Sequence, residues 1–169
     1  MRKIYIIGPV GSGKTTLSKK LSNNYNIKRY ELDKVVWDDD HGNIKRKDEE
    51  VLKLFDEILT NDFWIIEDVG RSIFIKGREQ ADIIYYIKLS RLKSYLRVTK
   101  RWIKQKLRIE VYNHPPTLKQ LLYFLSTVNS YYKKEKEKIK SLEKYKEKTI
   151  FINKRKINKL INNKGENHE

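Results

Sequence analysis

A glycine-rich segment near the start of the chain constrains the fold more than any other feature. It reads Gly-Pro-Val-Gly-Ser-Gly-Lys-Thr over residues 8–15 and fits the pattern G-x-x-x-x-G-K-[ST] at every fixed position. An apolar, β-branched run at 2–7 predicts a buried strand before it, and residues 14–23 predict a helix after it. A strand, a glycine-rich turn and a helix in this order are typical of a phosphate-binding P-loop.

Each residue type in this loop has a physical role in holding a nucleoside triphosphate. The glycines let the backbone turn its N–H groups towards the phosphates, and the helix adds its positive N-terminus. Lys14 is predicted to reach the β- and γ-phosphates, and Thr15 to bind Mg²⁺ through its hydroxyl. Because the sequence has no N-K-x-D signature for guanine, it favours ATP over GTP. The predicted nucleotide-binding residues of the loop are Gly8, Pro9, Val10, Gly11, Ser12, Gly13, Lys14 and Thr15.

Short apolar segments alternate with helical patterns along the rest of the chain. Further strands are predicted at 27–32, 63–66, 81–89 and 149–152, and further helices at 48–59, 92–107, 117–146 and 154–161, with a polar loop at 38–43. The alternation implies an α/β fold, a five-stranded, mostly parallel sheet with helices on both faces. The length of 169 residues suggests a single domain, 1–169, with a frayed tail at 162–169.

Composition narrows the classes of protein. The chain has no cysteine, and no apolar run approaches the roughly 18 residues of a membrane helix, so we expect a soluble cytoplasmic protein with no membrane partner. The net charge of +16, from 38 basic and 22 acidic residues, is typical of contact with nucleic acid, a membrane surface or anionic small substrates. A lysine-rich composition gives the same charge without any such partner, so the sequence leaves open whether the charge marks a binding surface. The oligomeric state also stays open.

Charged residues follow two of the predicted strands, at the edge of the sheet where ligands bind in such folds. Glu31 and Asp33 would point the same way if the second strand continues, and would hold Mg²⁺ through water or take a proton from a hydroxyl acceptor. Glu67 is the first acid after the third apolar run, as in a Walker-B site for Mg²⁺, and Asp68 is its close competitor. Arg71 is predicted to clamp an acceptor phosphate or carboxylate. The alternative is a set of solvated surface charges.

Residues 88–108 hold nine basic residues and no acid. Arg97, Arg101 and Arg108 share roughly one face of the predicted helix and would stabilise a moving phosphoryl group if they lie over the phosphates. The alternative is a merely solvated helix face. Residues 91–119 are therefore predicted to form a basic lid that orders when phosphate arrives. The opposite stripe, predicted to face inward, is Leu92, Leu96, Thr99, Ile103 and Leu107.

These motifs resemble those of the adenylate-kinase-like P-loop kinases, and more closely those of the small bacterial DNA topology modulation proteins. The likeness extends through the strand at 149–152. It rests on the P-loop, on Leu-Asp-Lys-Val-Val-Trp at 32–37, on Trp-Ile-Ile with its trailing acid at 64–67, and on Arg97-x-x-x-Arg101. The resemblance implies the strand order 2-3-1-4-5 and the use of ATP and Mg²⁺.

On the nucleotide side, the resemblance assigns roles to single residues. Lys14, Thr15 and Thr16 match the phosphate loop and its magnesium hydroxyl. Arg97 falls on an arginine that packs against the base, and Arg101 on one that touches phosphates. Arg155 lies in the late loop that closes over the base.

On the acceptor side, the match is less regular. Glu67 stands where the nucleoside monophosphate kinases have Asp, Asp68 where they have Gly, and Arg71 falls on their acceptor-phosphate arginine. Asp33, Trp37 and Arg71 are the predicted acceptor-binding residues. The segment at 34–62 is predicted to form an acceptor-side insertion, but it matches no recognisable monophosphate-binding module.

Two classes of function fit these features. The first is a kinase that transfers the γ-phosphate of ATP to a small hydroxyl- or phosphate-bearing acceptor, with Lys14, Asp33, Arg97 and Arg101 as catalytic residues. The second is a nucleotide-gated protein that binds DNA or RNA. A polynucleotide 5′-hydroxyl kinase would satisfy both.

Overall fold

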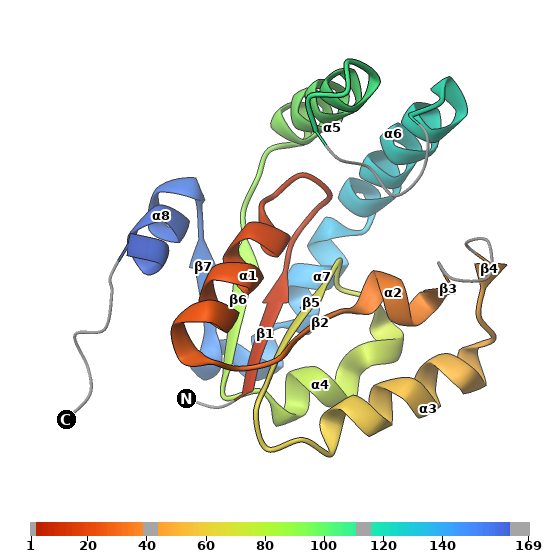
Figure 1. Ribbon diagram of the computed structural model, residues 1–169. Coiled ribbons are helices and arrows are strands. Elements are labelled where there is room, and N and C mark those ends of the chain that lie inside the picture. The colour runs from red at the N-terminus through yellow and green to blue at the C-terminus, as the bar shows by residue number, and fades with distance from the viewer. Residues whose placement is uncertain (1–2, 39–43, 111–115, 163–169) are drawn as a thin grey trace.

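A five-stranded parallel sheet forms the centre of the molecule in the computed structural model, which describes residues 3–38, 44–110 and 116–162 (Figure 1). Its strands, in spatial order, are β2 (Arg29–Glu31), β5 (Trp64–Asp68), β1 (Lys3–Ile7), β6 (Ile83–Ile87) and β7 (Thr149–Ile152). Every neighbouring pair is parallel. Counted along the chain, the order is 2-3-1-4-5, which confirms the predicted fold class and topology.

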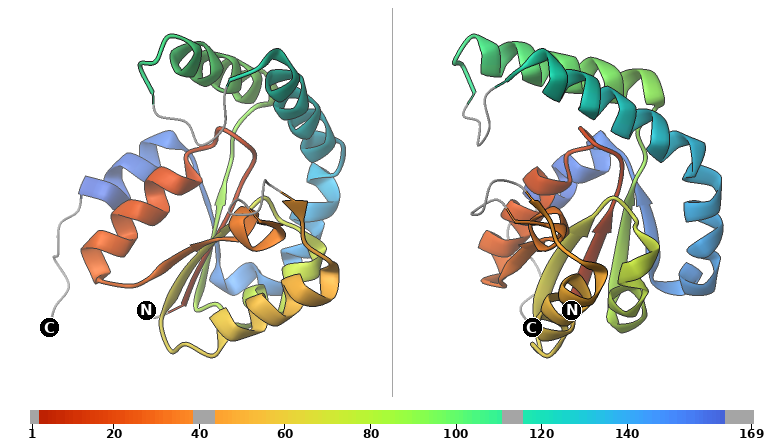
Figure 2. Two further views of the ribbon diagram at one scale, coloured as in Figure 1. Left: turned by 45° about the vertical axis from the view of Figure 1, so that its right-hand side comes forward. Right: turned by 90° about the vertical axis from the view of Figure 1, so that its right-hand side faces the viewer.

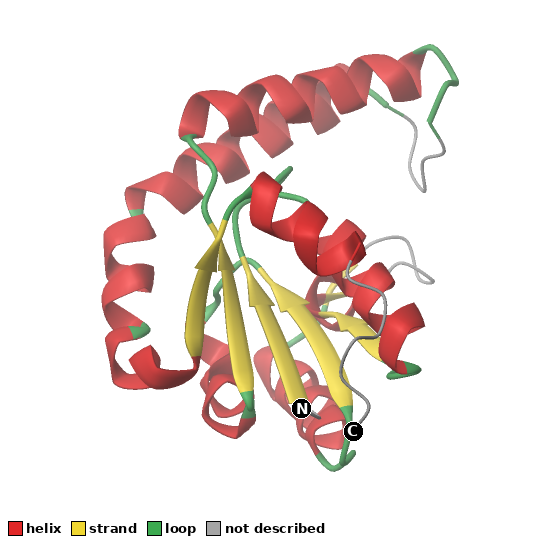
Figure 3. Ribbon diagram, turned by 90° about the vertical axis from the view of Figure 1, so that its left-hand side faces the viewer, coloured by secondary structure: helices red, strands yellow, loops and turns green. Residues whose placement is uncertain are grey.

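Helices cover both faces of the sheet (Figure 3). On one face, α1 (Lys14–Tyr25) and α8 (Lys154–Asn162) contribute Leu17, Leu21 and Ile157 to an apolar cluster with the strands. On the other, α3 (Asp48–Leu59) packs with 3₁₀ helix η1 (Ser72–Phe74), beside α4 (Ile75–Gln80), and the ring centroids of Phe55 and Phe74 lie 4.7 Å apart. The central strands are buried on both sides, which explains their continuous apolar sequence.

Two long helices, α5 (Arg91–Lys106) and α6 (Leu118–Lys133), lie side by side above the carboxyl ends of the strands (Figure 2). Val98 of α5 packs with Leu121 and Val128 of α6, and Val10 of the P-loop joins this cluster. The predicted basic lid therefore lies against the glycine-rich loop. Its motion stays a prediction, and residues 111–115 lie outside the described residues.

The second strand is shorter than predicted. It ends at Glu31, and the chain turns directly into helix α2 (Leu32–Val36). Leu32 and Val36 are four residues apart and both buried, a spacing that fits a helical turn facing the core. After α2, the short strands β3 (Trp37–Asp38) and β4 (Ile44–Lys45) pair antiparallel. The predicted polar loop at 38–43 lies outside the described residues, apart from Asp38.

The prediction of one long helix over 117–146 was wrong. The chain forms α6, then α7 (Glu135–Ser141) and the 3₁₀ helix η2 (Glu143–Lys148). The break falls at Lys134, whose N–H donates to the Tyr131 carbonyl at 3.1 Å. It lets the chain bend from the top of the sheet down its side, where Leu142 and Tyr145 are buried.

The inward stripe predicted for α5 was also wrong. Ser94, Val98 and Gln105 form its buried face, whereas Leu92, Leu96, Ile103 and Leu107 are exposed. The Ser94 hydroxyl donates to the Val10 carbonyl at 2.6 Å, and this polar contact with the P-loop fixes which face of α5 packs against the protein.

Among the described residues no helix is long and apolar enough to cross a membrane. The predicted frayed tail lies outside the described residues apart from Asn162.

Candidate active site

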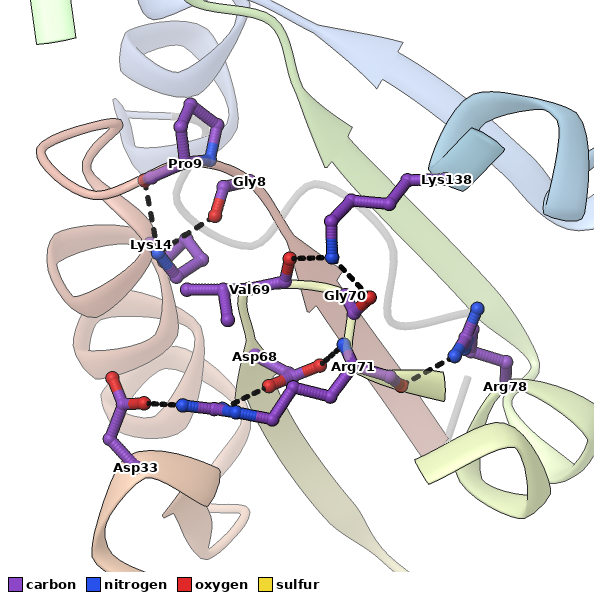
Figure 4. A network of polar contacts seen from close by, with 10 residues as sticks. All are labelled: Gly8, Pro9, Lys14, Asp33, Asp68, Val69, Gly70, Arg71, Arg78 and Lys138. Carbon is purple, nitrogen blue, oxygen red and sulfur yellow. Dashed lines mark hydrogen bonds and ion pairs between the residues drawn. The ribbon is translucent and has the colours of Figure 1, made fainter. Parts of the chain in front are cut away.

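The P-loop wraps around the side chain of its own lysine (Figure 4). Lys14 Nζ donates to the carbonyl oxygens of Gly8 at 3.0 Å and Pro9 at 3.1 Å. Gly11 and Gly13 have φ of 76° and 100°, which L-residues rarely adopt and which explains the glycines at both positions. Burial lowers the pKa of Lys14, although nearby Asp33 and other acids oppose that shift. The ammonium group thus lies inside the turn that the sequence assigns to phosphates.

Thr15 and Glu67 meet beside the loop. The Thr15 hydroxyl donates to Glu67 Oε1 at 3.0 Å, and the side chain of Glu67 is buried. Burial raises the pKa of Glu67, and Lys14 opposes the shift. Glu67 Oε2 has no hydrogen-bond partner among the residues that the structure describes, which is costly for a buried carboxylate oxygen.

These two residues have the chemistry that Mg²⁺ needs. A hydroxyl and a buried carboxylate oxygen are hard ligands, and Mg²⁺ in nucleotide sites takes few protein ligands beside phosphates and water. No group of three or more His, Cys, Asp or Glu residues that could hold a metal occurs among the described residues. Few protein side chains would therefore bind the Mg²⁺ directly, as in other nucleotide sites.

Arg71 is held between two carboxylates. Its Nη1 lies 2.5 Å from Oδ1 of the buried Asp68, and its backbone N–H donates to Asp68 Oδ2 at 2.6 Å. Its Nη2 forms an ion pair with Asp33 of α2. Burial lowers the pKa of Arg71, but Asp68 and Asp33 outweigh that effect and leave it raised. Because Asp68 is paired with Arg71, Glu67 is the acid that lies beside Thr15, and Arg29 Nη1 lies 3.7 Å from its Oε1.

The predicted pairing of Glu31 with Asp33 on one side of a strand was wrong. Glu31 is the last residue of β2 and lies 2.5 Å from Arg29 Nη1. Asp33 belongs to α2, which carries it away from that pair and towards Arg71. The strand ends early because Leu32 turns into the core.

Two basic side chains that the sequence did not single out support the Arg71 loop. Lys138 of α7 donates to the carbonyl oxygens of Val69 at 3.1 Å and Gly70 at 2.5 Å (Figure 4). Arg78 of α4 donates to the Arg71 carbonyl at 2.6 Å. In the sequence, Lys138 belongs to a Lys/Glu run with no signal of burial, so only the three-dimensional path of α7 reveals its role.

Arg46 supports α2 in a similar way. Its Nη1 donates to the carbonyl oxygens of Lys34 at 2.9 Å and Trp37 at 3.0 Å, where the helix ends. Its guanidinium also pairs with Glu50 at 3.0 Å. Trp37 is half-buried and packs against the apolar cluster beneath α2. Arg46 therefore fixes the segment that carries Asp33.

A pocket of about 220 Å³ opens beside the P-loop. Arg97 of α5 reaches it, and Arg97 Nη1 donates to the Gly11 carbonyl at 2.9 Å. Arg155 is exposed on α8 and does not line this pocket. Lys154 and Asn158 of the same helix do line it, although the sequence had not singled them out. The lining residues are Ser12, Gly13, Thr16, Arg97, Lys154, Ile157 and Asn158.

Arg101 of α5 is the other arginine predicted to contact phosphates. It is exposed, and its Nε lies 3.5 Å from Glu110 Oε1. It lines a second, small cavity with Val10 and Gly11. The structure thus places Arg101 near Val10 and Gly11 of the P-loop.

Two solved structures resemble this chain to different extents. A gluconokinase from Sinorhizobium meliloti 1021 superposes with a TM-score of 0.59 at 15% identity, over 95% of this chain and 87% of that one. A shikimate kinase from Acinetobacter baumannii, solved with shikimate, gives a TM-score of 0.49 at 18% identity, over 79% of each chain. No protein-family model matches the sequence, and no curated protein does so. At 15% identity the likeness to the gluconokinase establishes a shared fold alone.

Proposed function

We propose that this protein is an ATP-dependent phosphotransferase that moves the γ-phosphate of ATP to a small-molecule acceptor. The observation that carries the proposal is the convergence of two sets of residues at one end of the sheet. Lys14, Thr15 and Glu67 form a triphosphate and metal side, and Asp33 with Arg71 forms a second polar side. Asp33 opposes the fall that burial causes in the pKa of Lys14, which supports the assignment of the two sides to one site.

On the nucleotide side, Lys14 exchanges its carbonyl partners for the β- and γ-phosphates. The pocket beside Thr16 and Arg97 takes the nucleoside. Mg²⁺, held by Thr15 and Glu67, would neutralise charge on the phosphate oxygens. Arg97 contacts the backbone of Gly11 and lines the same pocket, which supports its assignment to the base or a phosphate.

On the acceptor side, Asp33 orients the attacking hydroxyl and accepts its proton as the oxygen bonds to the γ-phosphorus. The bond from that phosphorus to the bridging oxygen breaks, and ADP leaves. Arg71 binds an anionic group of the acceptor, because its guanidinium offers a planar fork to phosphate or carboxylate. Trp37, on the segment after α2, is assigned to the same acceptor side.

The finer resemblance to DNA topology modulation proteins, and with it a nucleic-acid partner, stays a prediction. A cheap measurement separates this class from a kinase. Genuine phosphate contacts give a log–log dependence of DNA affinity on salt with a slope of several units, whereas incidental charge gives weak binding at physiological salt.

An acceptor screen tests the proposal. ATP-dependent ADP release is measured with nucleosides, nucleoside monophosphates, polyhydroxy acids such as gluconate, and 5′-hydroxyl oligonucleotides. We expect one class of small molecule to raise ADP release well above the rate with ATP alone, and Lys14→Ala to abolish the increase. If none of the small molecules does so while the oligonucleotides do, the acceptor is a polynucleotide. If nothing stimulates release, the phosphotransferase proposal is wrong.

A further inference from the structure

The outer face of α5 carries an apolar stripe that no described part of the chain covers. The side chains are exposed at Leu92 by 69%, at Leu96 by 62%, at Ile103 by 45% and at Leu107 by 63%. Leu118 and Leu122 of the neighbouring α6 are exposed by 64% and 59%. Isolated exposed apolar residues are ordinary, but a helical row of four is a surface feature that calls for a contact.

Closure of α5 over bound nucleotide would not cover this stripe. The side of α5 that meets the P-loop carries Ser94 and Arg97, which contact the carbonyl oxygens of Val10 and Gly11. At 100° per residue, Ser94 lies roughly opposite the row that contains Leu96 and Ile103. Any movement towards the phosphates therefore leaves the stripe facing outward.

The stripe is bordered by positive charge. Lys93, Lys100, Lys104 and Lys106 of α5 are all exposed, and Glu110 is the single acid in the sequence from 91 to 133. A second copy of the chain would bring these lysines against each other, and repulsion between like charges disfavours that pairing. Nucleic acid would satisfy the lysines but would leave the leucines in water. A surface that is anionic outside and apolar beneath satisfies both.

We propose that this outer face of α5 binds an anionic lipid surface. The leucines and Ile103 enter the boundary between headgroups and acyl chains, while the lysines extend along them to the anionic headgroups. A helix that lies on the membrane surface does not have to span the bilayer, so this binding agrees with the absence of a membrane-spanning helix among the described residues. It revises the sequence-based expectation of no membrane partner, and it does not depend on the proposed phosphotransfer.

Sedimentation with lipid vesicles tests the proposal on the full chain. Vesicles of phosphatidylglycerol with phosphatidylcholine are compared with vesicles of phosphatidylcholine alone, at low and at physiological salt. The apolar variant is Leu96→Ser/Ile103→Ser, and its matched control is Ile44→Ser/Ile75→Ser, at two other exposed isoleucines. The charge variant is Lys93→Gln/Lys100→Gln, and its matched control is Lys19→Gln/Lys20→Gln, on the exposed side of α1.

We expect the protein to bind the anionic vesicles and not the neutral ones. The apolar variant should bind at least about tenfold more weakly, and the charge variant about fivefold more weakly for each lysine removed, while both controls bind as the unaltered chain does. ATP affinity should be unchanged in all four variants, which separates this proposal from the assignment of the nucleotide site.

Three results would overturn it. The first is a lack of binding to anionic vesicles at low salt. The second is equal loss in the charge variant and its control with none in the apolar variant, which would mean that net charge alone drives binding. The third is a concentration-dependent dimer in analytical ultracentrifugation that the apolar variant abolishes, which would make a second copy of the chain the occupant of the stripe.

Discussion

Arg71 and Asp33 lie 38 positions apart in the chain, yet their side chains form an ion pair across the candidate site. The same guanidinium is held from behind by the buried Asp68. Arg71 is thus fixed on one side and shared with a largely exposed carboxylate on the other. In the proposed reaction, an anionic acceptor would replace Asp33 on Arg71 and free that carboxylate for the attacking hydroxyl.

Asp33→Asn should leave ATP affinity near that of the unaltered protein and lower acceptor-dependent turnover by about 10² to 10⁴, the usual contribution of a general base. Equilibrium ATP binding and steady-state ADP release measure the two effects. Asp56→Asn, at an acid that pairs with Lys76 far from the P-loop, serves as the control. Acceptor-dependent turnover that survives Asp33→Asn intact would refute the assignment of the base.

Arg101→Ala should also bind ATP normally but lower kcat by roughly 10³ to 10⁵, as the loss of a phosphate-contacting arginine does in related transfers. Arg101 pairs loosely with Glu110, so little holds it away from the phosphates. Arg101→Lys should rescue poorly, because a point charge does not replace the planar fork. Lys104→Ala, on the same helix, is the control. Normal turnover of Arg101→Ala would show that the resemblance misplaces this residue.

Lys14→Ala should weaken ATP binding by roughly tenfold to a hundredfold, the range of charge-assisted hydrogen bonds, and abolish turnover. Lys14 is the cation that the loop encloses. Lys19→Ala removes the same charge from an exposed position on the same helix and should leave both quantities unchanged. Isothermal titration with ATP and Mg²⁺ compares the variants. Unchanged affinity and turnover in Lys14→Ala would mean that the loop does not serve ATP.

Glu67→Gln should stabilise the nucleotide-free protein at neutral pH. Because burial raises the pKa of Glu67, its contribution to the free energy of unfolding is largest below the unfolded value of about 4.3 and falls as pH rises through the folded value. The variant should therefore unfold at a higher temperature at pH 8, with a smaller difference near pH 4. Glu57→Gln, at an exposed glutamate of α3, should show neither effect.

The same Glu67→Gln variant should lose most of the Mg²⁺ dependence of ATP binding. Glutamine retains an acceptor for the Thr15 hydroxyl but not the negative charge that a divalent cation needs. Titrations with and without Mg²⁺ measure the difference. If ATP binding by the variant keeps its full dependence on Mg²⁺, another residue holds the metal.

Amide hydrogen exchange should report the lid. We expect protection of α5 and α6 to increase when a non-hydrolysable ATP analogue and Mg²⁺ are added, because the phosphates attract the basic side chains that face the P-loop. Helix α3 packs on the face of the sheet opposite α1 and is the internal control. Equal protection of α5 and α6 in both states would contradict a lid.

The sequence by itself determined the P-loop, the α/β class and the five parallel strands. Each depends on a local pattern: Gly8 to Thr15 forms one contiguous motif, and the strands are runs of apolar residues that both faces of the sheet bury. The strand order followed from the family resemblance, and the structure confirms it. Where the local pattern was ambiguous, the element boundaries differed, as at Leu32, which begins a helix instead of ending a strand.

Only the tertiary structure decided how the site residues meet. Periodicity shows that Leu92, Leu96 and Ile103 share a face of α5, but it does not show which face meets the protein. The contact between Ser94 and the Val10 carbonyl settled that question. The pairing of Arg71 with Asp33 and the contacts of Lys138 are equally invisible in sequence, since each joins segments that come together only when the sheet and its helices pack. Local patterns place a residue on a face of its own element, whereas the packing of distant elements determines what that face touches.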